Sequence, residues 1–148
     1  MKIYVGADHL GFEKRASILK YLAAQGFDVA DKGDAKLSPD DDYPQFAGRV
    51  ASAVLASSDP EPRGILLCGS GQGMCMAANR YKGIRACLGY NSKAVKSARN
   101  DDDSNVLCLP AGSFKADKVY EIVETWLKTP FAAAPRFIRR NNELDQLG

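Results

Sequence analysis

Two short stretches of this sequence bring together side chains that can move protons or attack a substrate. The first carries Asp8 and His9, the latter being the single histidine of the chain. The second, residues 68–74, begins with the thiol of Cys68 and adds a hydroxyl at Ser70. A thiolate and an imidazole can both exchange protons near neutral pH. These residue types predict proton transfer or nucleophilic chemistry on a small hydroxylated or phosphorylated ligand.

The second stretch also predicts a nest of backbone N–H groups. Glycines at alternate positions remove Cβ atoms where the backbone has to approach a ligand. Because a predicted helix follows, successive N–H groups form a site for a phosphate or a transient oxyanion, and they favour the thiolate form of Cys68. The residues of this turn are Gly69, Gly71, Gln72, Gly73 and Met74. Two simpler interpretations stay open: a tight turn that binds nothing, and a cysteine that is only a small buried hydrophobe.

This turn does not match the common nucleotide or phosphatase loops. The glycines lack the G-x-G-x-x-G spacing of dinucleotide sites, and no Gly-Lys-Ser/Thr follows as in a P-loop. Met74 stands where a Cys-x5-Arg phosphatase loop has its arginine. No Cys-x-x-Cys pair occurs, and one histidine is too few for most metal sites. We therefore expect neither a metal nor a cofactor, and a nucleotide-binding module is the weakest alternative.

Further candidate residues lie elsewhere in the chain. Tyr43 precedes Pro44 at a predicted helix start and would supply a phenol. Arg136 and Arg140 are four residues apart, so on a helix they share one face and could clamp a phosphate. A plain helix start and a solvated basic tail are the alternatives. Residues 101–103, three consecutive aspartates, predict a solvated loop.

Composition limits the class of protein. The chain has 148 residues, a formal net charge of +2, 45% apolar and 26% charged residues. This predicts one folded domain over 1–148, with 130–148 as a C-terminal tail. The small net charge argues against nucleic acid as a partner, and no apolar run is long enough for a membrane span. Without a secretory signal we expect a cytoplasmic protein with reduced thiols.

The elements that must position these residues alternate between short apolar runs and helical patterns. Strands are predicted at 2–6, 27–30, 64–68, 84–88 and 105–109. Helices are predicted at 12–25, 44–57, after the glycine turn to about 82, at 93–99 and at 114–128. In the first helix, the apolar or small residues at Phe12, Ala16, Leu19 and Ala23 suggest the buried face.

This alternation predicts an α/β fold. We expect a Rossmann-like three-layer αβα sandwich with a five-stranded parallel sheet in the order 2-1-3-4-5. In such sheets ligands bind beyond the carboxyl ends of the strands, where the strand order reverses. That point lies between the first and third strands. The Asp8-His9 stretch and the Cys68 turn both follow those strands directly.

Several motifs, in order along the chain, resemble one known family. They are Gly6-Ala7-Asp8-His9-Leu10-Gly11-Phe12, Asp42-Tyr43-Pro44-Gln45-Phe46-Ala47, Gly64 to Met74, Ala77 to Arg80 with Lys82 to Ala86, and Asn105-Val106-Leu107. Together they resemble the ribose-5-phosphate isomerase B family, which also contains the galactose-6-phosphate isomerase subunits. The resemblance runs from Met1 to about Arg140.

The resemblance implies a metal-free aldose–ketose isomerase that works through a cis-enediolate. It implies that Cys68 is the base that carries a proton between C1 and C2 of the sugar. Ser70 would assist at the sugar oxygens, where the family often has threonine. The N–H groups from Gly69 to Met74 would hold the enediolate oxygen.

The resemblance also implies how the substrate is bound. Asp8 would contact the sugar and His9 the phosphate, with Tyr43 lining the pocket. Arg136 and Arg140 resemble the paired phosphate arginines of the family. The family is dimeric, so we expect a homodimer, or a dimer of dimers, in which the partner's fourth helix region completes each pocket and the tail packs on the partner.

The chain departs from the family pattern at charged positions. Asp101 stands where the ring-opening histidine is usual, and Asp102 where an asparagine is usual. Residues 110–113 lack the arginine that usually follows the fifth strand, and Phe137 replaces a common histidine. We expect Asp101 to act as the ring-opening base and Asp102 to bind substrate hydroxyls. Two carboxylates near a phosphate repel it, so the substrate stays open between ribose 5-phosphate and a different or unphosphorylated sugar. A silent sugar-binding subunit of a mixed assembly is the third hypothesis.

Overall fold

The computed structural model describes residues 1–147, so Gly148 of the predicted domain lies outside the described part. The strands are β1 (Lys2–Ala7), β2 (Asp28–Asp31), β3 (Arg63–Cys68), β4 (Ala86–Leu88) and β5 (Val106–Pro110). The helices are α1 (Phe12–Ala24), α2 (Tyr43–Leu55), α3 (Gln72–Ala78), α4 (Ser92–Asp102), α5 (Ala116–Lys128) and α6 (Pro135–Leu144), with a short 3₁₀ turn, η1 (His9–Gly11), before α1.

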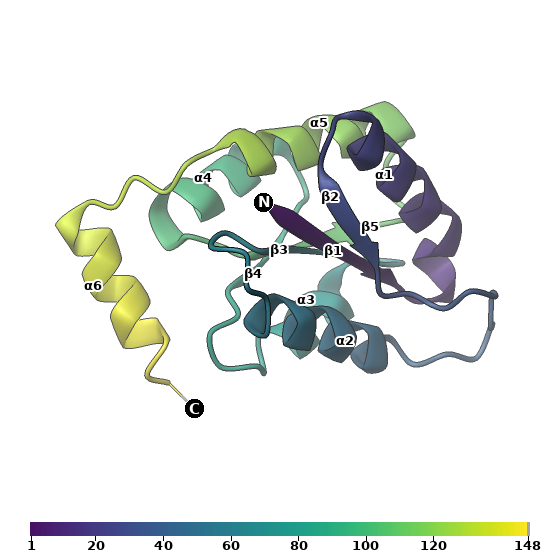
Figure 1. The fold of residues 1–148 in the computed structure, drawn as a ribbon, viewed down its shortest axis with the longest axis horizontal. Helices are drawn as coiled ribbons and strands as arrows, with labels where there is room; N and C mark the ends of the chain where they lie inside the picture. Colours follow the sequence, from purple (N-terminus) through teal and green to yellow (C-terminus); the bar gives the residue numbers. More distant parts are fainter. Residues whose placement is uncertain (148) are drawn as a thin grey trace.

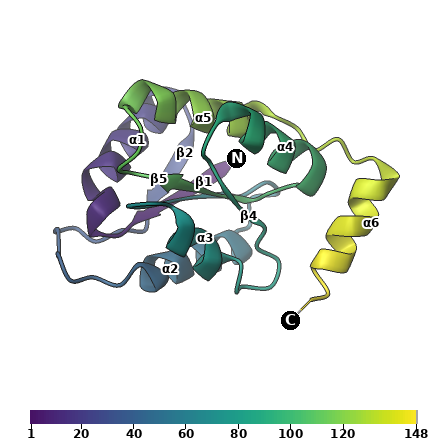
Figure 2. The same ribbon diagram turned by 180° about the vertical axis from the view of Figure 1, so that it is seen from behind.

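All strand pairs are parallel, and helices cover both faces of the sheet. Figure 1 shows α1, α4 and α5 on one side and α2 and α3 on the other, and Figure 2 shows the same layers from behind. The predicted three-layer α/β fold is therefore confirmed. No helix in the part of the chain described here is long and apolar enough to cross a membrane.

The predicted strand order was wrong at one edge. The sheet runs β2-β1-β3-β5-β4, so the fifth strand lies inside and the fourth forms the edge. Burial gives the reason. Every residue of β5 is buried, whereas the three residues of β4 are only partly buried. A long apolar strand gains more from having neighbours on both sides, and a short strand suits an edge.

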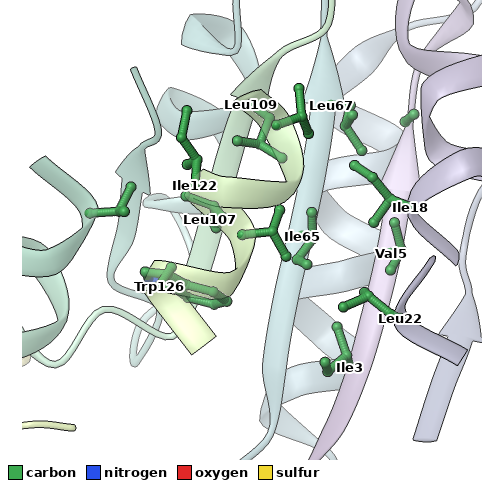
Figure 3. Close-up of a cluster of buried hydrophobic side chains, with 14 residues drawn as sticks. Ile3, Val5, Ile18, Leu22, Ile65, Leu67, Leu107, Leu109, Ile122 and Trp126 are labelled. Atoms are coloured by element: carbon green, nitrogen blue, oxygen red, sulfur yellow. The ribbon is translucent and has the colours of Figure 1, made fainter. Parts of the chain in front are cut away.

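The core consists of two clusters, one on each face of the sheet. Figure 3 shows the cluster under α1 and α5, in which alternate residues of β1, β3 and β5 meet the helices. Its labelled members are Ile3, Val5, Ile18, Leu22, Ile65, Leu67, Leu107, Leu109, Ile122 and Trp126. The intervening strand residues pack on α2 and α3, in a second cluster that includes Phe46, Leu66 and Cys68. Because the strands are buried on both faces, they are continuous apolar runs rather than alternating ones.

The buried face of α1 differs from the predicted one. Ile18 and Leu22 are fully buried, whereas Ala16 and Ala23 are exposed. Isoleucine and leucine remove more apolar surface from water than alanine does, so the helix turns them toward the sheet.

Two C-terminal segments are more ordered than predicted. Residues 101 and 102 form the end of α4, which stops at Asp103, where φ is 48°. The tail contains α6, with Pro135 in its first turn. In Figure 1, α6 lies at the periphery of the molecule, beyond α4.

Candidate functional site

The carboxyl ends of β1 and β3 place Asp8 beside Cys68. Ala7 is paired with Leu67, and the Asp8 backbone N–H donates to the Leu67 carbonyl at 3.2 Å. Cys68 follows Leu67, which faces α1 and α5, and its side chain packs on the α2–α3 side, while Asp8 is the first residue after β1. Adjacent strands are about 4.8 Å apart. The predicted meeting of these two stretches at the strand-order reversal is confirmed.

The thiol of Cys68 has a defined hydrogen-bond partner. The backbone N–H of Gly71 donates to Cys68 Sγ at 3.1 Å. Cys68 is only 6% exposed, so it is buried at the carboxyl end of β3. The turn therefore supplies an oriented hydrogen-bond donor to the sulfur atom.

The glycine turn is shaped by packing as much as by any ligand. Gly71 has φ of 74°, a conformation that favours glycine, and it immediately precedes α3. A Cβ on Gly73 would lie 2.8 Å from Cζ of Tyr43, and one on Gly69 would lie 2.7 Å from a methyl carbon of Leu10. Two of the spaces predicted for a ligand's approach are thus filled by neighbouring side chains.

Tyr43 belongs to the same edge. It begins α2, its ring lies against Gly73, and it is 40% exposed. Ser70 accepts the backbone N–H of Gln72 at 3.3 Å, which gives the turn a local side-chain link. Both predicted residues therefore lie near the Cys68 turn, as the sequence suggested.

Asp8 caps the turn that follows β1. One carboxylate oxygen, Oδ1, accepts the N–H groups of Leu10 at 3.0 Å and of Gly11 at 3.2 Å. The residue is 5% exposed, and its burial raises the pKa of Asp8, an effect partly offset by these N–H groups and by His9. The second oxygen, Oδ2, accepts neither of these two N–H groups and remains for another donor.

His9 is held by Asp41, a residue that the sequence alone did not indicate as part of the site. Its Nδ1 lies 2.7 Å from Oδ1 of Asp41, and its backbone N–H donates to the same oxygen at 3.0 Å. This hydrogen bond, reinforced by the charges of Asp8, Asp41 and Asp40, raises the pKa of His9 above 6.5. Asp41 lies 32 residues from His9 in an acidic loop, and no local sequence signal links the two.

Asp8, His9 and Asp41 each offer a possible metal-ligand atom, and these atoms lie within 4.8 Å of one another. Two of the atoms are already joined to each other by the Nδ1–Oδ1 hydrogen bond. A cation would have to displace that proton. The arrangement suits a proton-sharing pair better than a cation site.

The remaining predicted residues lie at the other end of the sheet. Asp101 and Asp102 end α4, ahead of β5, whereas Cys68 is paired with Pro110 at the far end of β5. A five-residue strand rises about 13 Å between its first and last residues. Within one chain, Asp101 and Asp102 are therefore separated from the Cys68 turn.

The α4 end and the tail helix form a patch of their own. Burial and the neighbouring Asp101 raise the pKa of Asp102, and Arg140 on α6 acts in the opposite direction. Arg136, one turn earlier on α6, lies over the ring of Phe137 at 4.7 Å. The predicted site residues thus fall into two groups in a single chain, one at each end of the sheet.

The loop after β5 is held by a lysine. Nζ of Lys14 donates to the Ala111 carbonyl at 2.6 Å and also to the Phe114 carbonyl. Residues 110–114 have no charged side chain. Residues 110–114 therefore bring no cation of their own to the edge that holds His9, and the next charged side chain is that of Lys115.

The chain is similar to known proteins over most of its length. A family model described as Ribose/Galactose Isomerase matches residues 3–144. A probable ribose-5-phosphate isomerase B of Mycoplasma pneumoniae is 42% identical over 129 residues, which are 87% of this chain and 84% of that protein. The ribose-5-phosphate isomerase B of Escherichia coli is 36% identical over 126 residues, 85% of this chain and 83% of its own.

Solved structures show the same fold. Ribose-5-phosphate isomerase B from Mycoplasma genitalium, solved with bound ribulose 5-phosphate, matches with a TM-score of 0.93 and 37% identity, covering 98% of this chain and 94% of that one. The Thermotoga maritima enzyme matches with a TM-score of 0.92 and 38% identity, covering 99% and 98%.

Proposed function

Because the chain belongs to the ribose/galactose isomerase family, whose matched relatives are aldose–ketose isomerases, we propose that it interconverts an aldose phosphate and its ketose without a metal. Ribose 5-phosphate and ribulose 5-phosphate are the proposed pair. The observation that carries the proposal is the Cys68 sulfur, which receives the Gly71 N–H at the carboxyl end of β3, where the backbone N–H of Asp8 donates to the Leu67 carbonyl.

The chemistry needs a base for a C–H bond next to a carbonyl group. In the proposed step the Cys68 thiolate takes the proton from C2 of the open-chain aldose, and the C–H electron pair forms the C1–C2 double bond of a cis-enediolate. The carbonyl oxygen gains the negative charge. The thiol then returns the proton to C1, and the ketose carbonyl forms at C2. Ser70 assists the exchange of hydroxyl protons between the two oxygens.

The developing negative charge needs donors that are already oriented. The first N–H groups of an α-helix have no acceptor within the helix. The turn at 69–74 leads directly into α3, so in this proposal the N–H groups of the turn that do not bond to Cys68 or Ser70 stabilise the enediolate oxygen. Asp8 receives a sugar hydroxyl on Oδ2, and His9 and Tyr43 line the binding pocket.

The group at the other end of the sheet completes the site from a second copy of the chain. In this proposal Asp101 of the second copy opens the sugar ring as a general base, and Asp102 binds a hydroxyl. Arg136 and Arg140 of the second copy contact the phosphate. The peripheral position of α6 and the separation of Asp101 from Cys68 support an assembly with shared sites.

The Cys68→Ala variant tests the proposed base. Removing a general base lowers kcat by roughly 10²–10⁴-fold, so conversion of ribose 5-phosphate should fall by that factor with little change in KM. Cys87→Ala is the matched control, since Cys87 lies on the edge strand β4 and should retain activity. Full activity of Cys68→Ala would exclude this cysteine as the base.

A panel of tetrose, pentose and hexose phosphates, with the free sugars beside them, tests the substrate. The aspartates at 101 and 102 and the uncharged loop at 110–114 favour a different or unphosphorylated sugar as the second candidate. Inhibition by inorganic phosphate supports the phosphorylated class. Turnover by the purified chain alone excludes a silent subunit, and failure to convert any member contradicts the proposed activity.

A further inference from the structure

His9 is tied to the acidic loop at two of its atoms. Both its ring Nδ1, at 2.7 Å, and its backbone N–H, at 3.0 Å, meet the same oxygen of Asp41. The Asp41 side chain is only 12% exposed, although the residues on either side of it, Asp40 and Asp42, are exposed. Of these three consecutive aspartates, the middle one is therefore turned inward.

Helix capping does not account for this contact. The residue that precedes α2 is Asp42, and its side chain makes no capping hydrogen bond. Asp41 is one residue further from the helix, and its carboxylate is directed at His9 instead. The contact joins the loop before α2 to the turn after β1, so it links two segments that both end at the Cys68 edge.

The hydrogen bond decides which ring nitrogen meets a ligand. With Nδ1–H donated to Asp41, the other nitrogen, Nε2, is the one left to meet a ligand. In the neutral ring this Nε2 is a bare acceptor, which an anion avoids. In the imidazolium it carries a hydrogen and donates to an anion. His9 can therefore donate a ring hydrogen bond to an anionic group only when it is protonated.

The charged groups around His9 all favour that protonated form. Asp41 accepts its ring N–H, and Asp8 and Asp40 contribute negative charge from the β1 end and the acidic loop. Lys14, a few residues along, directs its amine to the carbonyls of Ala111 and Phe114. The imidazolium is thus the positive group that this chain supplies beside Asp8.

We propose that Asp41 is a positioning residue for anion recognition, which fixes the His9 ring through Nδ1 and so directs Nε2–H at the phosphate of the substrate. The proposal rests on the proposed function and adds a residue to its binding site. It predicts that affinity for phosphate falls as pH rises through the titration of His9. It also predicts that loss of the Asp41 carboxylate moves this fall to lower pH.

A titration of the single histidine tests the proposal without turnover. The His9 ring resonance of the full chain is followed by NMR against pH in the wild type, Asp41→Asn and Asp40→Asn. Asp41→Asn should lower the pKa of His9 clearly. Asp40→Asn removes a nearby charge but no hydrogen bond, so its effect should be much smaller. Equal effects of the two variants, or none, would overturn the proposal.

Binding of inorganic phosphate, measured by calorimetry, gives the second readout. At about pH 7.5, Asp41→Asn should bind phosphate roughly tenfold more weakly than the wild type. The difference should vanish at about pH 5.5, where the His9 ring is protonated in both proteins. A constant loss at every pH would indicate a structural role only. Absence of phosphate binding by the wild type would also overturn the proposal.

A double-mutant cycle shows whether Asp41 acts through His9. In the His9→Gln background, Asp41→Asn should weaken phosphate binding no further. An additive loss would contradict the assignment. These measurements need no substrate turnover. Failure to convert any sugar phosphate would refute the proposed reaction. The role of Asp41 would still be decided by the His9 titration and by the measured binding of inorganic phosphate.

Discussion

Asp8 combines two roles in one carboxylate. Oδ1 holds the N–H groups of Leu10 and Gly11, which keeps the turn after β1 in place, and Oδ2 remains for a ligand. His9 is divided in the same way, with Nδ1 bonded to Asp41 and Nε2 left for a ligand. At the scale of the residue, the site is built from side chains that use one atom for structure and another for chemistry.

Two substitutions separate the roles of Asp8. Asp8→Asn keeps a capping oxygen, whereas Asp8→Ala removes it and should lower the free energy of unfolding by about 1 kcal/mol. Both should lower kcat/KM for the sugar phosphate. Denaturant unfolding and steady-state kinetics on the same samples check this. Normal kcat/KM in Asp8→Asn would remove Asp8 from the binding site.

The pH dependence of stability gives an independent check on Asp8. Burial raises the pKa of Asp8, so the folded state holds its proton more tightly than the unfolded chain. The corresponding stabilisation is complete at low pH and is lost as pH rises through the folded-state pKa. Relative to the wild type, Asp8→Asn should therefore gain stability as pH rises above about 4.

At the scale of the element, the site depends on contacts between the segments that follow the strands. Leu10 of η1 fills the space beside Gly69, and Tyr43 of α2 fills the space beside Gly73. Arg15 of α1 pairs with Asp31 at 3.2 Å and donates to the Asp34 carbonyl at 2.7 Å, which anchors the start of the loop that carries Asp41. These contacts hold the turn after β1, the turn after β3 and the loop before α2 in fixed positions relative to their neighbours.

Gly73→Ala tests the packing of Tyr43. The new Cβ would lie 2.8 Å from Cζ of the tyrosine ring, so the ring or the turn has to shift, with an expected cost of about 1–3 kcal/mol in unfolding free energy. Tyr43→Ala should abolish most of this cost in the double variant. Gly112→Ala is the control, because its Cβ would make only an ordinary 3.4 Å contact. Additive losses at 73 and 43 would show that the two do not interact.

At the scale of the whole molecule, one chain does not bring all the predicted residues together. Cys68 and Asp8 lie at the carboxyl edge of the sheet, whereas Asp101 and Asp102 end α4, and Arg140 of α6 acts on Asp102. A symmetric dimer lets the same two surfaces meet twice.

Mixing two inactive variants tests these shared sites. Cys68→Ala and Arg140→Ala should each be strongly impaired alone. In a symmetric dimer a hybrid has one site with both residues intact, so random reassortment should restore about a quarter of wild-type activity. Activity is measured after the two variants are unfolded and refolded together, with each refolded alone as the control. No recovery would show that Cys68 of one chain and Arg140 of the other do not meet in a shared site.

The local sequence was sufficient for the strands, for every helix except α6, and for the meeting of the two stretches that follow β1 and β3. Apolar runs indicated buried strands, Pro44 indicated a helix start, and the stretches at Asp8 and Cys68, each following a strand, were predicted to meet. These features are short-range, because propensity, turn chemistry and burial depend on residues close together in the chain. The acidic run at 101–103 was predicted as a loop, but α4 continues through residues 101 and 102.

The tertiary structure alone decided what joins distant residues. The position of β5 inside the sheet depends on how much apolar surface β5 can bury compared with β4. That comparison involves two separate segments of the chain. The bond of His9 to Asp41 spans 32 residues, and the contact of Tyr43 with Gly73 spans 30. Such pairings arise when the whole chain minimises exposed apolar surface and unsatisfied polar groups, and no single segment of this sequence contains that information.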